Sequence, residues 1–349
     1  MKKYLFLSLF ASCSFLANAQ SKEAQEPHLT KTLADAAIRQ VEVETSAGSI
    51  SVTGGANSEA RVEVYVTKNN RRQGDEAMSK EEIQRRLDSD YDLDISVSNG
   101  KVRATAKPKE RNMDWKRALI ISFKLFVPQN ITSELETSGG SIHLKNLTGS
   151  QDFSTSGGSL HVEGVSGKVK GKTSGGSIDL ADSKDDIDLE TSGGNIRAEN
   201  SSGRLQLSTS GGSLHLTGLS GTIKANTSGG GIRGANISGE LDTHTSGGSI
   251  TLTGLSCSLE ASTSGGHIDV AIKELGKYVR LTNSGGSVDL QLPSGKGVDL
   301  KLRANSIKKG TLTGFEGTVE DDEIDGKLNG GGVPVTVRAG SGRINLSVQ

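Results

Sequence analysis

The sequence predicts an all-β fold: a parallel, two-sheet β-solenoid of 18-residue coils with β-rich capping regions at both ends. Three observations support this prediction. A fixed period of this length is typical of a solenoid, apolar and polar residues alternate within each repeat, and the chain of 349 residues holds 46 Gly but only five Pro. The quartet Thr-Ser-Gly-Gly begins at eight positions, each 18 residues after the last: Thr137, Thr155, Thr173, Thr191, Thr209, Thr227, Thr245 and Thr263. A related NSGG begins at Asn283, and an early TSAGSI begins at Thr45.

Each repeat reads as two short strands separated by turns. In residues 209–226, Leu214 and Leu216 alternate with polar residues, and Ile223 and Ala225 do so again after a Thr-Gly and a Ser-Gly pair. Alternation of period two, bounded by glycine, indicates strands and turns. We expect the Gly-Gly pair to supply the positive φ of a sharp corner. A second turn is expected at Gly149, Gly167, Gly203, Gly221 and Gly239, with Asp185 as a tolerated substitute and Cys257 as an exception in the same column.

Residues 18 apart should lie about 4.8 Å from one another if the coils stack in register. One inward column is then aliphatic: Ile142, Leu160, Ile178, Ile196, Leu214, Ile232, Ile250 and Ile268. The repeat threonines should form a buried or half-buried ladder. One outward column mostly alternates in charge, as Asp152, Lys170, Asp188, Gln206, Lys224, Asp242 and Glu260. Asp179 should face Arg197, and Lys172 should face Glu190, which avoids most like-charge neighbours.

The flanking segments predict irregular caps. Strands are expected over residues 41–54 and 60–68, and a short helix over 79–87, because Ser79 and Glu82 form a capping box before Ile83 and Leu87. A hairpin turning at Asn99-Gly100 is expected over 94–107, and a buried strand over 118–128 that leads into the first regular coil. Further strands should follow near the C-terminus, separated by the polar residues 320–325.

The first residues have the pattern of an export signal. Lys2 and Lys3 precede an apolar run, and Ala17-Asn18-Ala19 is a small-x-small cleavage site. The run is too short for a stable membrane span. We therefore expect an exported protein of the periplasm, the cell surface or the extracellular space. Lipid anchoring through Cys13 is not expected, because Phe10 stands where a lipoprotein signal usually carries Leu.

The repeated T-S-G-G-x-I-x-L units and the ending NGGGVPVTVRAGSGRINL resemble a bacterial family of β-strand-repeat proteins provisionally described as adhesins. The likeness covers residues 41–348. It implies the solenoid architecture and an adhesive role, and it brings no catalytic residues to carry over.

Composition and motifs weigh against several functions. The formal charge is −1 with the signal and −3 without Lys2 and Lys3, so no basic field is available to collect nucleic-acid phosphates. A calcium β-roll needs a repeated carboxylate, whereas the corresponding column reads His143, His161, Asp179, Arg197, His215, Arg233, Thr251 and Asp269. We interpret Asp182, Asp185 and Asp186, and residues 320–325, as solvated loops rather than local ion sites.

His143 and His161, followed by Asp179, are the alternative with metal-ligand chemistry, because stacked imidazoles could approach one ion. We interpret this column instead as outward positions with variable polar occupants. The sequence predicts no metal, no other cofactor and no catalytic residue.

Polysaccharide cleavage by a β-helix lyase or hydrolase is the enzymatic alternative. Its only candidate is the acidic unit of Asp179, Asp182, Lys184, Asp185, Asp186 and Asp188. Catalysis needs converging groups in a cleft, and the array holds just Phe153 and Tyr278 as rings for sugar stacking.

Phosphate binding by the Gly-Gly turns would need one loop before a helix, and ice binding would need an outward Thr ladder. Cys257, the one cysteine left after cleavage, is expected to be a semi-buried free thiol.

The sequence therefore predicts a non-enzymatic, exported interaction protein of adhesin type, with a purely structural envelope scaffold as a further alternative. Its partner would be a protein or glycan of the envelope, and it would be monomeric and not membrane-spanning. The expected organisation is a signal peptide over 1–19, a mobile leader over 20–39, a capping region with the helix over 40–136, the regular solenoid over 137–282 and an irregular closing region over 283–349.

Overall fold

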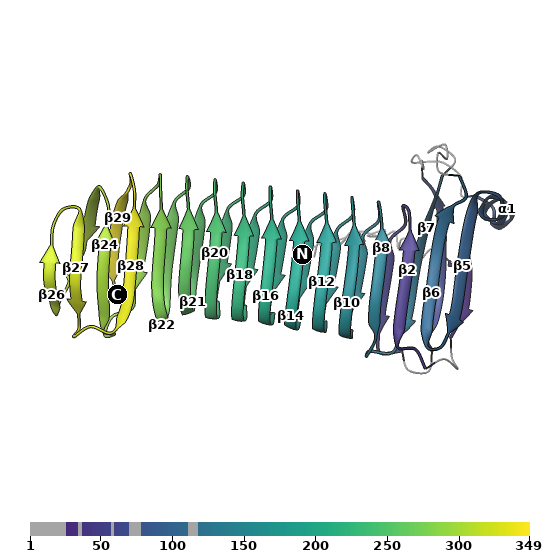
Figure 1. Cartoon of the computed structure of the whole chain (residues 1–349), viewed down its shortest axis with the longest axis horizontal. Helices are drawn as coiled ribbons and strands as arrows, with labels where there is room; N and C mark the ends of the chain where they lie inside the picture. The colour runs from purple at the N-terminus through teal and green to yellow at the C-terminus, as the bar shows by residue number, and fades with distance from the viewer. Residues whose placement is uncertain (1–25, 34–36, 57–58, 70–77, 111–117) are drawn as a thin grey trace, which may run out of the picture.

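In the computed structural model, which describes residues 26–33, 37–56, 59–69, 78–110 and 118–349, the chain is an elongated stack of strands (Figure 1). The all-β class and the solenoid-like form are confirmed. The predicted signal peptide lies outside the described residues.

The regular part consists of two rows of parallel strands, and each strand pairs with the one 18 residues further along. Thr155 pairs with Thr173, and Leu160 with Ile178. The longer strands are β8 (Thr132–Thr137), β10 (Thr148–Thr155), β12 (Ser166–Thr173), β14 (Lys184–Thr191), β16 (Ser202–Thr209), β18 (Ser220–Thr227) and β20 (Ser238–Thr245). The shorter strands are β9 (Ile142–Lys145), β11 (Leu160–Glu163), β13 (Ile178–Ala181), β15 (Ile196–Glu199), β17 (Leu214–Thr217) and β19 (Ile232–Ala235).

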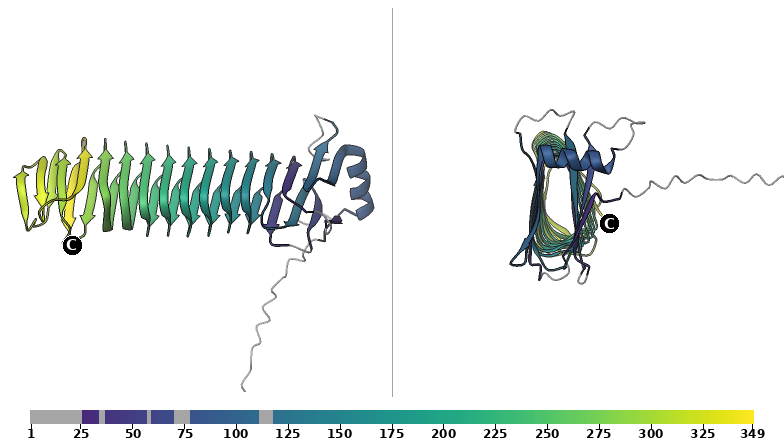
Figure 2. Two further views of the ribbon diagram at one scale, coloured as in Figure 1. Left: turned by 60° about the horizontal axis from the view of Figure 1, so that its bottom comes forward. Right: turned by 90° about the vertical axis from the view of Figure 1, so that its right-hand side faces the viewer.

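Two long strands join the rows. β21 (Ile250–Thr263) and β22 (Ile268–Asn283) each contribute to both rows, and their pairing contains register shifts near Cys257. All strands therefore belong to one hydrogen-bonded sheet. Seen along the axis, the coils superpose as a flattened ring (Figure 2).

The core lies between the two rows. The aliphatic column that begins at Ile142 is buried at every coil, as the alternation predicts. The repeat threonines are also buried, with exposed fractions between 0% and 6%. Apolar burial of this kind is the main favourable term in folding, and no single coil achieves it alone.

The corner glycines have a different role from the one predicted. Neither residue of the Gly-Gly pair in a TSGG quartet has a positive φ. A Cβ on the second glycine would lie about 2 Å from the carbonyl oxygen of the preceding coil, as for Gly158 against Gly140 at 2.0 Å. The second glycine is thus required by close contact between coils. Positive φ is found at the second turn instead, as predicted, from 100° at Gly239 to 117° at Gly149, and at 83° for Asp185.

A third turn also uses the left-handed region and was not recognised from the sequence. Its column holds Asn146, Gly164, Asp182, Asn200, Gly218, Asn236 and Gly254, with φ between 49° and 64°. Asn and Asp tolerate this conformation better than other residues with side chains.

The N-terminal region inserts a coil out of sequence order. β2 (Gln40–Thr45) and β3 (Ile50–Gly54) pair on one side with β8 and β9. On the other side they pair with β6 (Lys101–Pro108) and β7 (Leu119–Val127). The early TSAGSI motif is therefore a true coil of the stack. β7 lies one coil further from the regular stack than predicted. The coil of β2 and β3 lies between β7 and the first regular coil.

The remaining cap elements follow the sequence closely. β4 (Arg61–Lys68) pairs antiparallel with β7, and β5 (Tyr91–Ser98) with β6, through a turn where Asn99 and Gly100 have φ of 51° and 77°. α1 (Lys80–Asp90) begins at the predicted Ser79 cap, whose side chain accepts from the Glu82 amide, but ends three residues later than expected. Part of the predicted mobile leader is a strand, β1 (Leu29–Thr32), because it pairs with the free edge of β4.

The C-terminal region repeats the insertion. β28 (Val333–Ala339) and β29 (Arg343–Val348) lie between the pair β22 and β23 (Val288–Leu292) and the pair β24 (Val298–Arg303) and β25 (Ser306–Lys309). The end of the chain therefore fills an internal position rather than the tip (Figure 1). The tip is the hairpin of β26 (Phe315–Val319) and β27 (Glu323–Leu328), so the predicted separating segment 320–325 is its turn and the start of β27.

Candidate functional site

The column proposed as a metal alternative forms a stack of rings. His143 and His161 lie face to face, with ring centroids 4.5 Å apart and planes within 9°. Parallel rings direct their nitrogen lone pairs side by side rather than toward one ion. Asp179 faces Arg197 in register, as predicted, and its carboxylate lies 3.1 Å from Nδ1 of His161 on the other side. In the described part of the chain, no group of three or more His, Cys, Asp or Glu residues is placed to hold a metal ion.

The first histidine of this stack is an exposed residue whose ring is partly desolvated by its neighbours. This desolvation, with a smaller contribution from the neighbouring His161, lowers the pKa of His143. His143 is therefore a neutral ring at pH 7.5.

The acidic unit considered for polysaccharide cleavage does not converge. Asp182 and Asp185 occupy left-handed turns, and the Asp185 carboxylate accepts the Gly167 amide at 3.0 Å. Asp186 lies between Lys168 and Arg204 in register, and Asp188 lies beside Lys170. These carboxylates serve turns and cross-strand charge pairing, and they do not face one another across a cleft.

Cys257 is fully buried rather than semi-buried, with 1% of its surface exposed. Burial raises the pKa of its thiol to about 11. The cause is local: Cys257 replaces the turn glycine of its column, and β21 continues through this position with a bulge.

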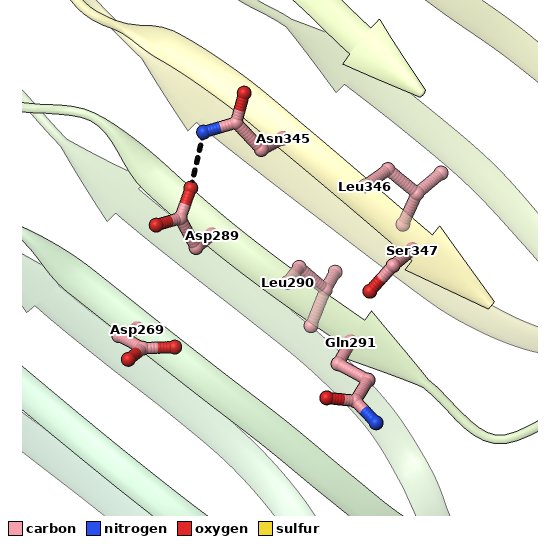
Figure 3. A pocket seen from close by; sticks show the side chains of 7 residues that line it. All are labelled: Asp269, Asp289, Leu290, Gln291, Asn345, Leu346 and Ser347. Carbon is pink, nitrogen blue, oxygen red and sulfur yellow. Dashed lines mark hydrogen bonds between the residues drawn. The ribbon is translucent and has the colours of Figure 1, made fainter. Parts of the chain in front are cut away.

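One surface depression lies near the C-terminal end, on β22, β23 and β29 (Figure 3). It has a volume of about 360 Å³, and Asp269, Asp289 and Asn345 lie along its polar side. Asn345 donates to one Asp289 oxygen, and the other lies 2.9 Å from His267 Nε2. Both oxygens of the Asp289 carboxylate therefore already have hydrogen-bond partners within the depression.

Two further depressions lie along a single edge of the stack, at the TSGG corners that form the upper row of narrow loops in Figure 1. They have volumes of about 350 and 380 Å³. The first is lined by Glu136, Thr137, Ser138, Ser154, Thr155, Ser156, Lys172, Thr173, Ser174, Glu190 and Ser192. The second is lined by Ser208, Thr209, Lys224, Asn226, Thr227, Ser228, Asp242, His244 and Ser246. The residues that line the two depressions come largely from the same columns of the repeat, so this edge is the most regular candidate for binding.

The first of these depressions contains one cross-strand ion pair and a further carboxylate, Glu136. Lys172 and Glu190 form the predicted cross-strand ion pair at 2.8 Å, and this hydrogen bond raises the pKa of Lys172. Sequence reasoning did not find this surface, since hollows between outward columns depend on side-chain lengths in neighbouring coils.

A comparison with family models finds a match for the second part of the stack. The model described as Toastrack DUF4097, a family of unknown function, matches residues 180–347, slightly less than half of the chain. Residues 180–347 are therefore similar to a Toastrack domain. The recognition made from the repeats and the closing segment is thereby confirmed, and the Toastrack match includes the second edge depression and the C-terminal one.

Solved structures similar to this chain also come from proteins provisionally named for adhesion. One is a candidate cell adhesion protein from Clostridium sporogenes, with 11% identity, a TM-score of 0.20, and coverage of 92% of this chain and 98% of that one. Another is a candidate adhesin from Bacteroides fragilis, with 13% identity, a TM-score of 0.36, and coverage of 69% and 96%. No curated protein matches the chain significantly. Within the described residues, no helix has the length and apolar character needed to cross a membrane.

Proposed function

We propose that the protein is an exported, non-enzymatic, adhesin-like interaction protein of the cell envelope, built as a flattened two-sheet rod of 18-residue coils. The observation that carries this proposal is the pair of depressions that repeat along one edge of the stack. Such a surface offers many equivalent contacts to an extended partner, which suits adhesion better than turnover of a small substrate.

The distribution of ionisable groups favours binding over catalysis. Lys145 pairs with Glu163 at 2.8 Å, and Arg280 with Glu260 at 3.5 Å, each between neighbouring coils. An acid and a base that act together must approach the same reacting atom. Cross-strand pairs of this kind neutralise each other along the rod instead.

The structures at the two ends of the rod favour a monomeric protein over an end-to-end assembly. β26 carries Glu316 and leads into an acidic turn at residues 320–322, and α1 packs beside β5 at the other end. Charges and covering elements at a sheet edge oppose pairing with a second copy. Light scattering should therefore give a monomer at all accessible concentrations, and concentration-dependent polymers would contradict this part of the proposal.

Localisation tests the proposal most directly. A tagged chain would be expressed in its native host, the envelope fractionated, and intact cells treated with an external protease. We expect export and, for an adhesin, protease accessibility, together with weaker attachment of a deletion strain to glycan-coated surfaces. A cytoplasmic chain, or a strictly periplasmic one, would exclude an adhesive role.

A further inference from the structure

The tip of the hairpin formed by β5 and β6 is an asparagine followed by a glycine. Asn99 and Gly100 form a two-residue turn in which both have a positive φ, 51° and 77°, the conformation that fits tight hairpins. The Asn99 side chain is exposed, and among the described residues it has no hydrogen-bond partner. Gly100 has no side chain to hinder access to its backbone nitrogen. This side chain is therefore free to react with the backbone that follows it.

The chain contains one other asparagine before a glycine, which allows a direct comparison. Asn329 precedes Gly330, is also exposed and has a φ of 53°. Its side chain is held, however, since Nδ2 donates to the Lys296 carbonyl at 3.2 Å. Its backbone amide donates to the Gly314 carbonyl at 2.9 Å. The two dipeptides share sequence, exposure and backbone conformation, and they differ in the freedom of the asparagine side chain.

Other asparagines in left-handed turns are shielded by the residue that follows them. Asn146, Asn200 and Asn236 have positive φ, but the next residues are Leu, Ser and Ile. A side chain at that position hinders the approach of its backbone nitrogen to the asparagine Cγ. Asn99 is the asparagine at which the following residue and the side-chain environment both favour reaction.

We propose that Asn99 is a site of spontaneous covalent modification, at which the side chain cyclises onto the Gly100 amide. The Gly100 nitrogen gives up its proton to solvent base and attacks Cγ of Asn99, which closes a succinimide ring. The bond between Cγ and Nδ2 breaks, and this nitrogen takes up a proton and leaves as ammonia. Water then opens the ring at either carbonyl carbon and leaves aspartate or isoaspartate. Water is the only co-reactant.

Isoaspartate lengthens the turn, because it adds a methylene group to the main chain. The Gly100 carbonyl accepts the amides of Arg39 and Gln40, at 2.8 and 3.1 Å. These hydrogen bonds fix the start of β2 against the hairpin, where Gln40 pairs with Lys101. A Cβ on Gly100 would lie 2.6 Å from the Ala37 carbonyl oxygen, so the turn has little spare room. The modified turn therefore loosens the entry into β2 in the N-terminal cap.

The test incubates the full mature chain in mildly alkaline buffer and follows both dipeptides by mass spectrometry. Trypsin releases residues 87–101 and 328–338, each with a single asparagine, and a carboxylate in place of the amide changes the peptide mass. An isoaspartyl methyltransferase with a labelled methyl donor measures isoaspartate separately. We expect Asn99 to convert at least about fivefold faster than Asn329, because a hydrogen bond that must first break slows the reaction by about this factor.

The same incubation in guanidinium chloride is the control. Neither side chain is held there, so Asn99 and Asn329 should convert at similar rates, which would assign the difference to the fold. Asn99→Gly keeps a residue that adopts positive φ and should abolish the mass change in the first peptide. Hydrogen exchange at the Arg39 and Gln40 amides should be faster in the modified fraction than in fresh protein.

Three results would overturn parts of this inference. Conversion of Asn329 at an equal or faster rate in the folded chain would exclude a role for side-chain freedom. An Asn99 that converts only in the unfolded chain would show that the turn prevents the reaction. Unchanged exchange at the Arg39 and Gln40 amides would contradict the effect on the cap. The proposed adhesive function is independent of all three results.

Discussion

The hydroxyl of Thr191 donates to the carbonyl oxygen of Gly176 in the preceding coil, at 2.7 Å. The hydroxyl oxygen of Thr191 also accepts the amide of Gly194, at 3.3 Å, within its own corner. Each repeat threonine therefore closes its own turn and fastens it to the coil before. At the ninth copy, Asn283 performs both tasks with its amide, donating to Gly266 at 2.7 Å and accepting from Gly286 at 2.8 Å.

Removing this hydroxyl should destabilise the stack. Thr191→Val keeps the shape but leaves the Gly176 carbonyl and the Gly194 amide without their partner, which should lower the free energy of unfolding by about 1–3 kcal/mol. Urea unfolding followed by circular dichroism measures the change. Thr191→Ser, which keeps the hydroxyl, should lose less, and Thr217→Val on the exposed surface should change stability by no more than about 0.5 kcal/mol. Equal losses at Thr191 and Thr217 would contradict this role.

The two glycines of one corner should respond differently to the same substitution. A Cβ at Gly176 would lie 2.0 Å from the Gly158 oxygen, whereas one at Gly175 would lie 3.6 Å from the nearest atom. Gly176→Ala should therefore cost about 3 kcal/mol or more through overpacking, and Gly175→Ala should be close to neutral. Thermal unfolding of the two variants side by side decides the matter, and similar melting temperatures would refute the close-contact explanation.

The thiol of Cys257 should be inert in the folded protein. Its burial and its pKa of about 11 leave almost no accessible thiolate at pH 8. An aromatic disulfide reagent should label it slowly in buffer and completely in guanidinium chloride. A non-reducing gel should show no dimer. Rapid labelling of the native chain would contradict the buried position.

Acid should weaken the stack partly through His143. Its pKa is lowered in the folded chain, so the unfolded chain, with a value of about 6.5, binds the proton more readily. The contribution to stability is complete above pH 6.5 and is lost as the pH falls through 6.5 toward the folded-state pKa.

A substitution that removes the titrating ring should reduce this loss. His143→Gln should show a smaller fall in melting temperature between pH 7.5 and 5.5 than the unsubstituted chain. The groups facing His143 are His161 on one side and Ser51, then Lys124, on the other. An unchanged pH profile in His143→Gln would contradict this assignment.

The coil period, the aliphatic column and the threonine ladder could all be predicted, because each is a local pattern repeated along the chain. The need for glycine at Gly158 could not, because it arises from the distance between two stacked coils rather than from the conformation of one. The register of Asp179 beside Arg197 could be predicted, but the contact of its carboxylate with His161 could not, since either neighbour satisfies the charge pattern. The edge depressions escaped prediction for a similar reason: the sequence identifies outward columns but not the hollows between them.

Because each end of the rod contains an inserted coil, the structure of the two ends does not depend on the number of regular coils between them. Residues 333–348 complete a position between strands that come before them in the sequence. Between the two insertions, an 18-residue unit could be duplicated or lost by recombination while both end structures stay the same. Such events would change the length of the rod in steps of one coil.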